Sequence, residues 1–176
     1  MYPLLFELGP VSIYSYGVLL ATAYIVGLQF ALRRADRAGL NGQRVMDLGI
    51  FVIISALVGA KLMLFLLDID RFTSDPAQFT VLLKSGGVFY GGLLLGVPGA
   101  WWYIRRHGLP LWTTCDLFAP GIALGHGIGR MGCLLAGCCY GSPTDVPWAI
   151  TFTSTLAAAN VGTPLEIALH PTQIYE

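Results

Sequence analysis

Charged residues are scarce in this sequence. Its 176 residues include 10 Lys and Arg and 10 Asp and Glu, so charged side chains make up 11% of the chain and the formal net charge is zero. Ordinary soluble domains carry about 25% charged residues. The scarcity, together with a hydrophobic content of 55%, argues against a water-soluble globule, a disordered chain and a nucleic-acid binder that depends on a basic patch. We therefore expect the lipid bilayer, and no nucleic acid, as a partner.

Four long segments are almost free of charge and predict membrane-spanning helices. They cover about residues 8–32, 48–67, 85–104 and 117–135. A helix of about 20 apolar residues crosses a bilayer core of about 30 Å. The sequence thus predicts an all-α, polytopic membrane protein with four spans, and a loop-like tail over residues 137–176, where four prolines occur. The spans leave no room for a separate soluble domain, so we expect one integral-membrane domain over residues 1–176.

The arginines predict which side of the membrane each loop occupies. Four of them follow the first segment and two follow the third, whereas the tail has no Lys or Arg (Arg33, Arg34, Arg37, Arg44, Arg105 and Arg106). Cationic residues concentrate in cytoplasmic loops, so the N-terminus and the tail are expected on the outer side. The first segment is not preceded by a positive region and is too long for a cleavable signal peptide.

Arg130 interrupts the fourth segment near its outer end. An arginine at mid-helix costs about 2.5–3.5 kcal/mol on insertion scales. In one interpretation the side chain extends to the interface or pairs with Asp116 or Glu176. In the other, its planar guanidinium binds an anionic lipid headgroup. The surrounding glycines, in Gly125-His-Gly-Ile-Gly-Arg-Met-Gly132, favour the second interpretation because they let a lipid or another backbone approach closely.

Three further polar residues lie within apolar segments. Lys61 interrupts the second segment, either reaching the interface or forming a structural pair. His126 lies one turn before Arg130 on the same helix face, where it either packs and hydrogen-bonds or takes part in catalysis. Tyr16 lies near the outer end of the first segment, so its hydroxyl is expected at the depth of Arg130.

Three of the four cysteines cluster at the outer end of the fourth segment. Cys133, Cys138 and Cys139 lie within seven residues, and Cys115 lies apart. This spacing lacks the C-x2-C pairing that is typical of zinc sites. The residues leave three alternatives open: packing of small side chains, a disulfide on an oxidising face, and a catalytic or metal-binding thiol, whose ionisation would need an adjacent base.

Six short motifs, taken in order, resemble the prolipoprotein diacylglyceryl transferase family over nearly the whole chain. They are Ser15-Tyr-Gly17, Gly59-Ala-Lys61, Phe89-Tyr-Gly-Gly-Leu93, Gly127-Ile-Gly-Arg-Met-Gly132, Gly137-Cys-Cys-Tyr-Gly141 and His170-Pro-Thr-Gln-Ile-Tyr-Glu176. Members of this bacterial inner-membrane family continue through further spans after the last motif. The resemblance therefore implies that this sequence is an incomplete chain.

The resemblance also implies a reaction. The family moves the diacylglyceryl group of phosphatidylglycerol to the lipobox cysteine thiol of a preprolipoprotein and releases glycerol phosphate. The reaction takes place at the periplasmic side, which agrees with the orientation predicted from the arginines. The implied partners are phosphatidylglycerol, preprolipoprotein signal peptides with a lipobox cysteine and the bilayer. No metal or other cofactor is expected.

Several residues match the family's functional positions. By resemblance, Arg130 corresponds to the arginine that holds the phosphatidylglycerol headgroup, and Tyr16 to an important tyrosine of the first span. Gly141 corresponds to the glycine that closes the family signature, and Gly132 is a further candidate for substrate binding. Candidates for catalysis are Tyr16, His126 and the position of Tyr90.

Three positions depart from the family pattern. Tyr90 stands where the family has a histidine that is often proposed as a base, Cys133 replaces an asparagine, and Cys138 replaces a glutamate. A neutral tyrosine with a pKa near 10 is a poor general base. The changes indicate either a divergent subgroup with the same chemistry or a relative with another acceptor.

The alternative to an enzyme is a small membrane protein that binds lipid or carries a solute, with its glycines serving helix packing. A carrier is expected to have related halves or helices broken at the midplane, and the sequence shows no such internal symmetry. Tyr16, Arg130 and the motif from His170 to Glu176 all map to the outer side, which favours an enzyme. Haem ligation by His107 and His126 is disfavoured because these residues are at opposite ends of their segments.

Overall fold

The computed structural model describes residues 2–9, 11–74 and 87–176, which form two compact units. The first unit combines Met1–Phe30 with Phe118–Glu176, and the second is formed by Ala31–Leu117. Two long helices, α1 (Ser15–Arg37) and α6 (Leu111–Ala136), each contribute residues to both units. The candidate site lies in the first unit.

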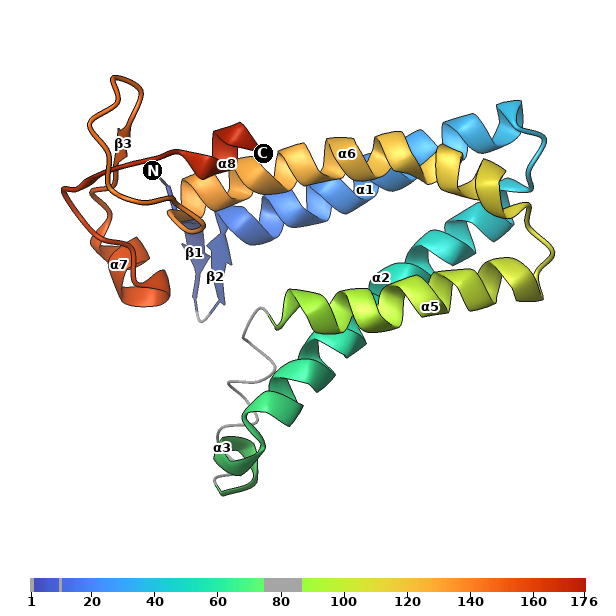
Figure 1. The fold of residues 1–176 in the computed structure, drawn as a ribbon, viewed down its shortest axis with the longest axis horizontal. Helices are drawn as coiled ribbons and strands as arrows, with labels where there is room; N and C mark the ends of the chain where they lie inside the picture. The colour runs from blue at the N-terminus through green and yellow to red at the C-terminus, as the bar shows by residue number, and fades with distance from the viewer. Residues whose placement is uncertain (1, 10, 75–86) are drawn as a thin grey trace. The chain divides into compact units, whose positions relative to one another are not determined.

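In the first unit, α1 and α6 lie side by side (Figure 1). Their backbones approach closely at Gly27 and Gly121. A Cβ atom at Gly27 would lie 3.0 Å from the Gly121 carbonyl oxygen, and one at Gly121 would lie 2.7 Å from the Gly27 oxygen. Glycine is therefore required on both helices at this contact, which holds the middle of α6 against the middle of α1.

The first apolar segment does not begin as a helix. Residues Leu4–Leu8 form β1 and Val11–Tyr14 form β2, which pair as an antiparallel hairpin, and α1 begins only at Ser15. The prediction of a span from residue 8 is therefore wrong at its start. The reason is local: Gly9 adopts a φ of 60° in the turn, a conformation that glycine adopts readily, and the apolar residues on both sides of it pair as strands.

The tail has its own small core. Strands β3 (Ile150–Thr151) and β4 (Ala168–Leu169) pair antiparallel. Helix α7 (Thr155–Val161) lies between them in the sequence, and α8 (Thr172–Tyr175) follows β4. Phe152, Ala157 and Leu169 are almost completely buried. Burying such side chains contributes about 1.5–3 kcal/mol for each of the larger ones. The predicted loop-like tail is thus an ordered cap on the unit.

The second unit is built around α2 (Gly42–Leu67) and α5 (Phe89–Arg106), with the short α3 (Ile69–Ser74) after α2. Asn41 caps α2 by accepting hydrogen bonds from the backbone N–H groups of Gln43 and Arg44. This cap explains why the helix begins before residue 48, where the apolar segment starts. Gly59 and Gly91 bring α2 and α5 into backbone contact.

The structure confirms a mainly helical protein and identifies two helices as candidate membrane spans. Among the described residues, α1 and α2 are long and apolar enough to cross a membrane. Only 17% and 6% of their most apolar windows are buried inside the protein, unlike the core helices of a soluble protein. The segments at 85–104 and 117–135 form α5 and α6, but these helices do not reach the same hydropathy, and residues 85–86 lie outside the described part. Their crossing of the membrane stays a prediction.

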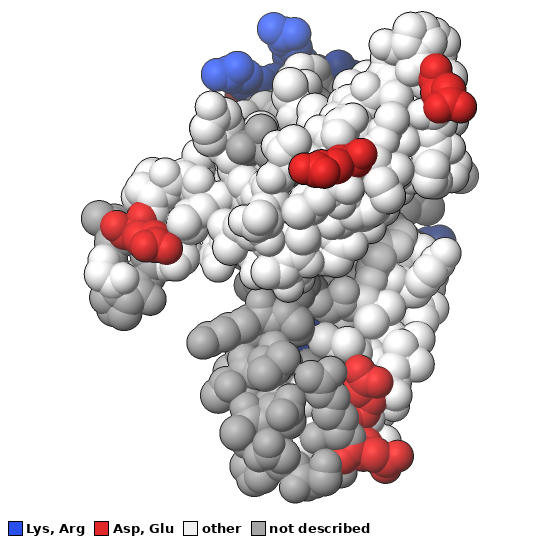
Figure 2. All heavy atoms as spheres, turned by 90° about the vertical axis from the view of Figure 1, so that its left-hand side faces the viewer, with Lys and Arg blue, Asp and Glu red and all other residues white. Residues whose placement is uncertain are grey.

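Charge is distributed unevenly over the surface. The last turn of α1 carries Arg34 and Arg37, and the last turn of α5 carries Arg105 and Arg106. On the side shown in Figure 2, acidic side chains are scattered, whereas most of the visible lysine and arginine side chains gather at one edge. The orientation that these arginines predict stays a prediction.

The glycine contact in the second unit generates a prediction. In Gly91→Ala, the added Cβ would overlap the Gly59 oxygen and the Met63 Cβ, so α2 and α5 must separate, at a cost of about 1–3 kcal/mol. Gly127→Ala is the matched control, because a Cβ there meets nothing within 4 Å. Thermal unfolding in detergent, followed by intrinsic fluorescence, should show a lower midpoint for Gly91→Ala alone. Equal midpoints for the two variants would contradict the contact.

Candidate functional site

Arg130 forms an ion pair with Glu176 near the C-terminal end of α6. The guanidinium Nη2 contacts the Glu176 Oε2, and the Arg130 side chain is 15% exposed whereas that of Glu176 is 55% exposed. His126, one turn earlier on α6, places its Nε2 4.0 Å from the same Glu176 oxygen. The ion pair agrees with one of the interpretations of Arg130 that the sequence left open. It joins α6 to the last residue of the His170–Glu176 motif.

The guanidinium also has an unused donor. The Arg130 Nε is buried and has no hydrogen-bond partner among the described residues. An unsatisfied buried donor costs about 1–3 kcal/mol. A hydrogen bond from this nitrogen to a ligand oxygen would remove that cost. It would therefore contribute more binding free energy than a hydrogen bond from an exposed arginine.

The His170–Glu176 motif is fastened to the segment that follows α6. Gln173 Nε2 donates a hydrogen bond to the Cys138 carbonyl at 2.6 Å, and the Thr172 hydroxyl donates one to the Cys139 carbonyl. The backbone N–H of Gly141 donates to the His170 carbonyl at 2.9 Å. Together these bonds set the position from which Glu176 reaches Arg130.

Gly141 lies where the two segments touch. A Cβ at this position would lie 2.8 Å from the His170 Cβ and 2.9 Å from the Thr172 Cγ2. The absence of a side chain therefore lets the motif pack on the chain after α6. This contact is a structural reason for a glycine at position 141. A contact between Gly141 and the substrate stays a prediction.

Tyr175 lies in a cluster of aromatic and polar groups that sequence reasoning missed. Its hydroxyl accepts a hydrogen bond from Trp148 Nε1 at 2.8 Å and lies 3.1 Å from His170 Nδ1. Tyr175 and His170 belong to the His170–Glu176 motif, but nothing in the motif indicates that these two side chains interact. No local pattern in the sequence distinguishes Trp148. Only the folding of the tail places Trp148 beside the motif.

Tyr16 lies against the same end of α6. It occupies the first turn of α1, and a Cβ at Gly132 would lie 3.3 Å from its ring atom Cδ2. Gly132 therefore makes room for the tyrosine ring. Tyr16 is within electrostatic reach of Cys133, Cys138 and Cys139. The structure thus brings Tyr16 and Gly132 together with the cysteines, and the depth of Tyr16 in the membrane stays a prediction.

The end of α6 brings the cysteines together. Gly137 adopts a φ of 78°, and the N–H groups of Gly137 and Cys138 both donate to the Cys133 carbonyl, at 2.9 and 3.0 Å. This is the Schellman arrangement, in which the second residue after the helix folds back onto the last turn. Cys139 then also adopts a left-handed conformation, with a φ of 60°. Two left-handed residues within three positions thus reverse the chain beside Cys133.

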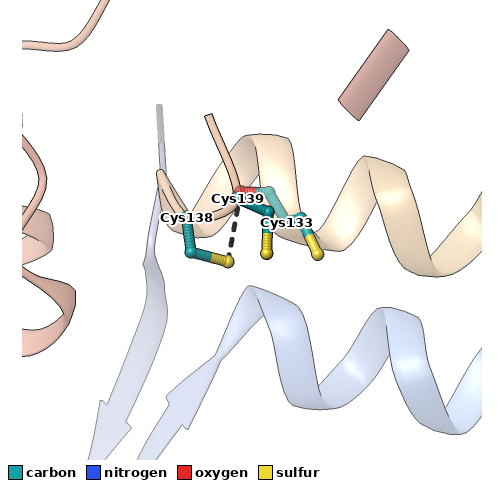
Figure 3. A group of neighbouring side chains, drawn as sticks. All are labelled: Cys133, Cys138 and Cys139. Atoms are coloured by element: carbon teal, nitrogen blue, oxygen red, sulfur yellow. Dashed lines mark hydrogen bonds between the residues drawn. The ribbon is translucent and has the colours of Figure 1, made fainter. Parts of the chain in front are cut away.

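The three sulfur atoms converge as a result. They lie within 4.8 Å of one another, and Figure 3 shows them pointing to the same side of the α6 end. All three thiols are free, with Cys133 buried and Cys139 exposed. Burial, reinforced by the neighbouring Cys133 and Cys139, raises the pKa of Cys138 to about 12. The spacing in the sequence does not indicate this convergence, because it arises from the turn.

Two candidate residues lie in the other unit. Tyr90 is in the first turn of α5, where it is exposed and contacts the ring of Phe89 edge-on at 5.9 Å between centroids. Lys61 is on α2. The predicted catalytic role of Tyr90 therefore stays a prediction, whereas Tyr16, His126, Arg130 and Gly132 all belong to the first unit.

Comparison with known proteins identifies relatives over almost the whole chain. The family model for prolipoprotein diacylglyceryl transferase matches residues 3–176. A phosphatidylglycerol–prolipoprotein diacylglyceryl transferase of Clostridium tetani is 35% identical over 99% of this chain and 68% of its own length. The corresponding proteins of Synechococcus elongatus and Vibrio vulnificus are each 32% identical, over 84% and 99% of this chain. The chain spans only 51% and 62% of their respective lengths.

The raised pKa of Cys138 generates a prediction for the reduced protein. A thiol with a pKa of about 12 is ionised to only about one part in ten thousand at pH 8. Alkylation of Cys138 by a maleimide, measured by peptide mass spectrometry, should be slow and should still rise about tenfold per pH unit between pH 8 and 10. A free cysteine peptide, with a pKa near 8.5, is the control and levels off in this range. A plateau for Cys138 below pH 9 would contradict the effect of burial.

Proposed function

Since the chain belongs to the prolipoprotein diacylglyceryl transferase family, we propose that it transfers the diacylglyceryl group of phosphatidylglycerol to the lipobox cysteine thiol of a preprolipoprotein. The observation that carries the proposal is the half-exposed ion pair of Arg130. A largely buried guanidinium is held at the outer end of α6 by a carboxylate that is itself exposed. Such a carboxylate can be displaced by another anion.

A lipid phosphate fits this position. Guanidinium groups bind phosphate through two parallel hydrogen bonds, and these charge-assisted bonds are about twice as strong as neutral ones. The unused Nε supplies one further donor for a phosphate oxygen. Around Arg130, a Cβ at Gly127 or Gly129 would meet nothing within 4 Å. The α6 surface one turn from the guanidinium is therefore open to the glycerol part of a headgroup.

In the proposed reaction one bond forms and one breaks. The sulfur of the acceptor cysteine forms a bond to the glycerol carbon that carries the phosphate ester. The bond between this carbon and the ester oxygen breaks, and its electron pair leaves with glycerol phosphate. The thiol proton passes to a base, for which Tyr16 and His126 are the candidates in the first unit. Arg130 stabilises the charge that develops on the leaving phosphate, which is the kind of electrostatic contribution that is usually largest in catalysis.

We further propose that the protein is a multi-pass protein of the bacterial inner membrane, with the N-terminus and the candidate site facing the periplasm. Basic residues at the ends of α1 and α5 support this orientation. Tyr16, Arg130 and the His170–Glu176 motif belong to one unit and contact a single end of α6.

The alternative is a protein that binds phosphatidylglycerol without transferring it. The same ion pair supports lipid binding, and Tyr90, Cys133 and Cys138 depart from the positions of the family base and its polar neighbours. The two functions differ in one observable. Transfer places label from phosphatidylglycerol on a cysteine thiol, whereas binding leaves the lipid intact.

A transfer assay with an arginine variant tests the proposal. Membranes that contain the protein receive phosphatidylglycerol labelled in its acyl chains and a lipobox peptide, and label on the peptide cysteine is measured. Removing one electrostatic stabiliser of a transition state typically costs about 10²–10³ in rate. Arg130→Ala should therefore lower the rate by at least about 100-fold, and Arg130→Lys should restore part of it.

Arg106→Ala is the matched control, because it removes an arginine from the last turn of α5 in the other unit. It should transfer label at the wild-type rate. Wild-type transfer by Arg130→Ala would overturn the role of Arg130. Intact lipid bound by the wild-type protein, with no label on the peptide, would replace the transferase proposal with the lipid-binding alternative.

A further inference from the structure

The three thiols at the end of α6 form a set of donors with a shared direction. Cys133 comes from the last turn of the helix, Cys138 from the turn that folds back onto it, and Cys139 from the next residue. Their sulfur atoms lie within 4.8 Å of one another. In Figure 3 all three point to one side, and the dashed line joins the Cys138 sulfur to the Cys133 carbonyl, 3.8 Å away.

This spacing suits a metal ion. Zinc binds thiolate sulfur at about 2.3 Å in a tetrahedral arrangement, which separates neighbouring sulfurs by about 3.8 Å. The three sulfurs need to move by no more than about 1 Å to reach it. A disulfide would use only two of the sulfurs and would leave the third without a role.

The backbone that carries the thiols is held from both sides. The Cys133 carbonyl accepts two hydrogen bonds from the turn, Gln173 donates to the Cys138 carbonyl, and Thr172 donates to the Cys139 carbonyl. A ligand set with its backbone already fixed loses little conformational entropy when it binds an ion. The exposed Cys139 also gives the ion a way in.

The charges around the thiols are also suitable. Three thiolates and one divalent cation carry a net charge of −1. The Arg130 guanidinium lies beside the Cys133 thiol and provides a positive charge next to the cluster, which it shares with Glu176. Among the described residues, the cluster contains these three cysteines and no His, Asp or Glu. The protein therefore supplies three ligands, as in catalytic zinc sites, which keep the fourth position for water or substrate.

We propose that Cys133, Cys138 and Cys139 bind one thiophilic divalent cation, such as Zn²⁺, and that its fourth position receives the acceptor thiol. The second half of this proposal rests on the proposed transferase function. Coordination deprotonates a thiol, so the metal would take over the task of the general base for which Tyr16 and His126 are the candidates in the first unit. This differs from the expectation, drawn from the sequence, that no metal is needed.

The step balances without any redox partner. The acceptor thiol releases its proton to water when its sulfur binds the metal. The sulfur lone pair then forms the bond to the glycerol carbon, and the carbon–oxygen bond breaks with its electron pair on the phosphate oxygen. The resulting thioether is a weak ligand and leaves the metal, whose oxidation state does not change.

Metal binding is tested on the reduced protein in nanodiscs, under anaerobic conditions, by titration with Co²⁺ and then Zn²⁺. We expect one Co²⁺ per chain, with sulfur-to-cobalt charge-transfer bands and the visible bands of a four-coordinate ion, which Zn²⁺ abolishes. Loss of an outer-sphere partner of a metal site typically costs 10–100-fold in affinity. The direct-ligand variants Cys133→Ser, Cys138→Ser and Cys139→Ser should therefore lose at least about that much.

Cys115→Ser is the matched control, since Cys115 lies in the other unit, outside the cluster. It should bind Co²⁺ as the wild type does. Absence of thiolate bands in the wild type, or equal binding by Cys139→Ser and Cys115→Ser, would overturn the metal site. So would a disulfide among the three cysteines in protein isolated without reductant, detected by intact mass.

The fourth position is tested with a lipobox peptide and the same peptide with serine in place of cysteine. The cysteine peptide alone should shift the visible cobalt bands. Full transfer activity after complete removal of metal would overturn this half of the proposal and leave the transferase function standing. Metal binding and the peptide-dependent shift, with no transfer, would instead support the site and contradict the transferase function.

Discussion

The arrangement of the first unit depends on the need of one arginine for an anion. Arg130 lies on a helix whose neighbouring residues are largely apolar, where an unpaired guanidinium is costly. Its partner, Glu176, comes from the far end of the tail. To deliver that carboxylate, the chain turns at Gly137, packs at Gly141 and bonds through Thr172 and Gln173 to the turn. These contacts fix the position from which the carboxylate reaches Arg130.

The ion pair also reconciles two interpretations that were posed as alternatives. Arg130 can form a structural ion pair and also bind a ligand if its partner carboxylate can be released from the pair. Glu176 is half-exposed whereas Arg130 is largely buried, so the carboxylate loses little solvation when it is in the pair and regains water when it is released. A phosphate can replace it at the same guanidinium without leaving a buried charge uncompensated. In the proposed function, the pair therefore holds Arg130 in place until the lipid phosphate takes the place of the carboxylate.

The sequence predicted the parts of this structure that follow from long-range composition. Runs without charge located the four long helices, and the predicted end at residue 67 matches the end of α2, because charge returns at Asp68. The predicted first residues of the helices were less accurate. Helix α2 begins before its apolar run because Asn41 caps it, and the apolar residues before Ser15 form a hairpin where the sequence predicts helix. For a structural partner of Arg130 the sequence offered Asp116 and Glu176, and the structure shows Glu176. The convergence of the thiols could not be predicted, because it depends on left-handed backbone at Gly137 and Cys139.

The cysteines differ in chemistry from the residues that the family has next to Arg130, but the total charge near the guanidinium can stay the same. The family resemblance places an asparagine and a glutamate where this chain has Cys133 and Cys138. Three neutral thiols would remove the negative charge of that glutamate from the neighbourhood of the guanidinium. Three thiolates around a divalent cation restore a net charge of −1 at the same place, and they add a position that ionises an incoming thiol. If the proposed metal is bound, the cluster thus adds a negative charge beside Arg130, next to the carboxylate of Glu176 that already pairs with it.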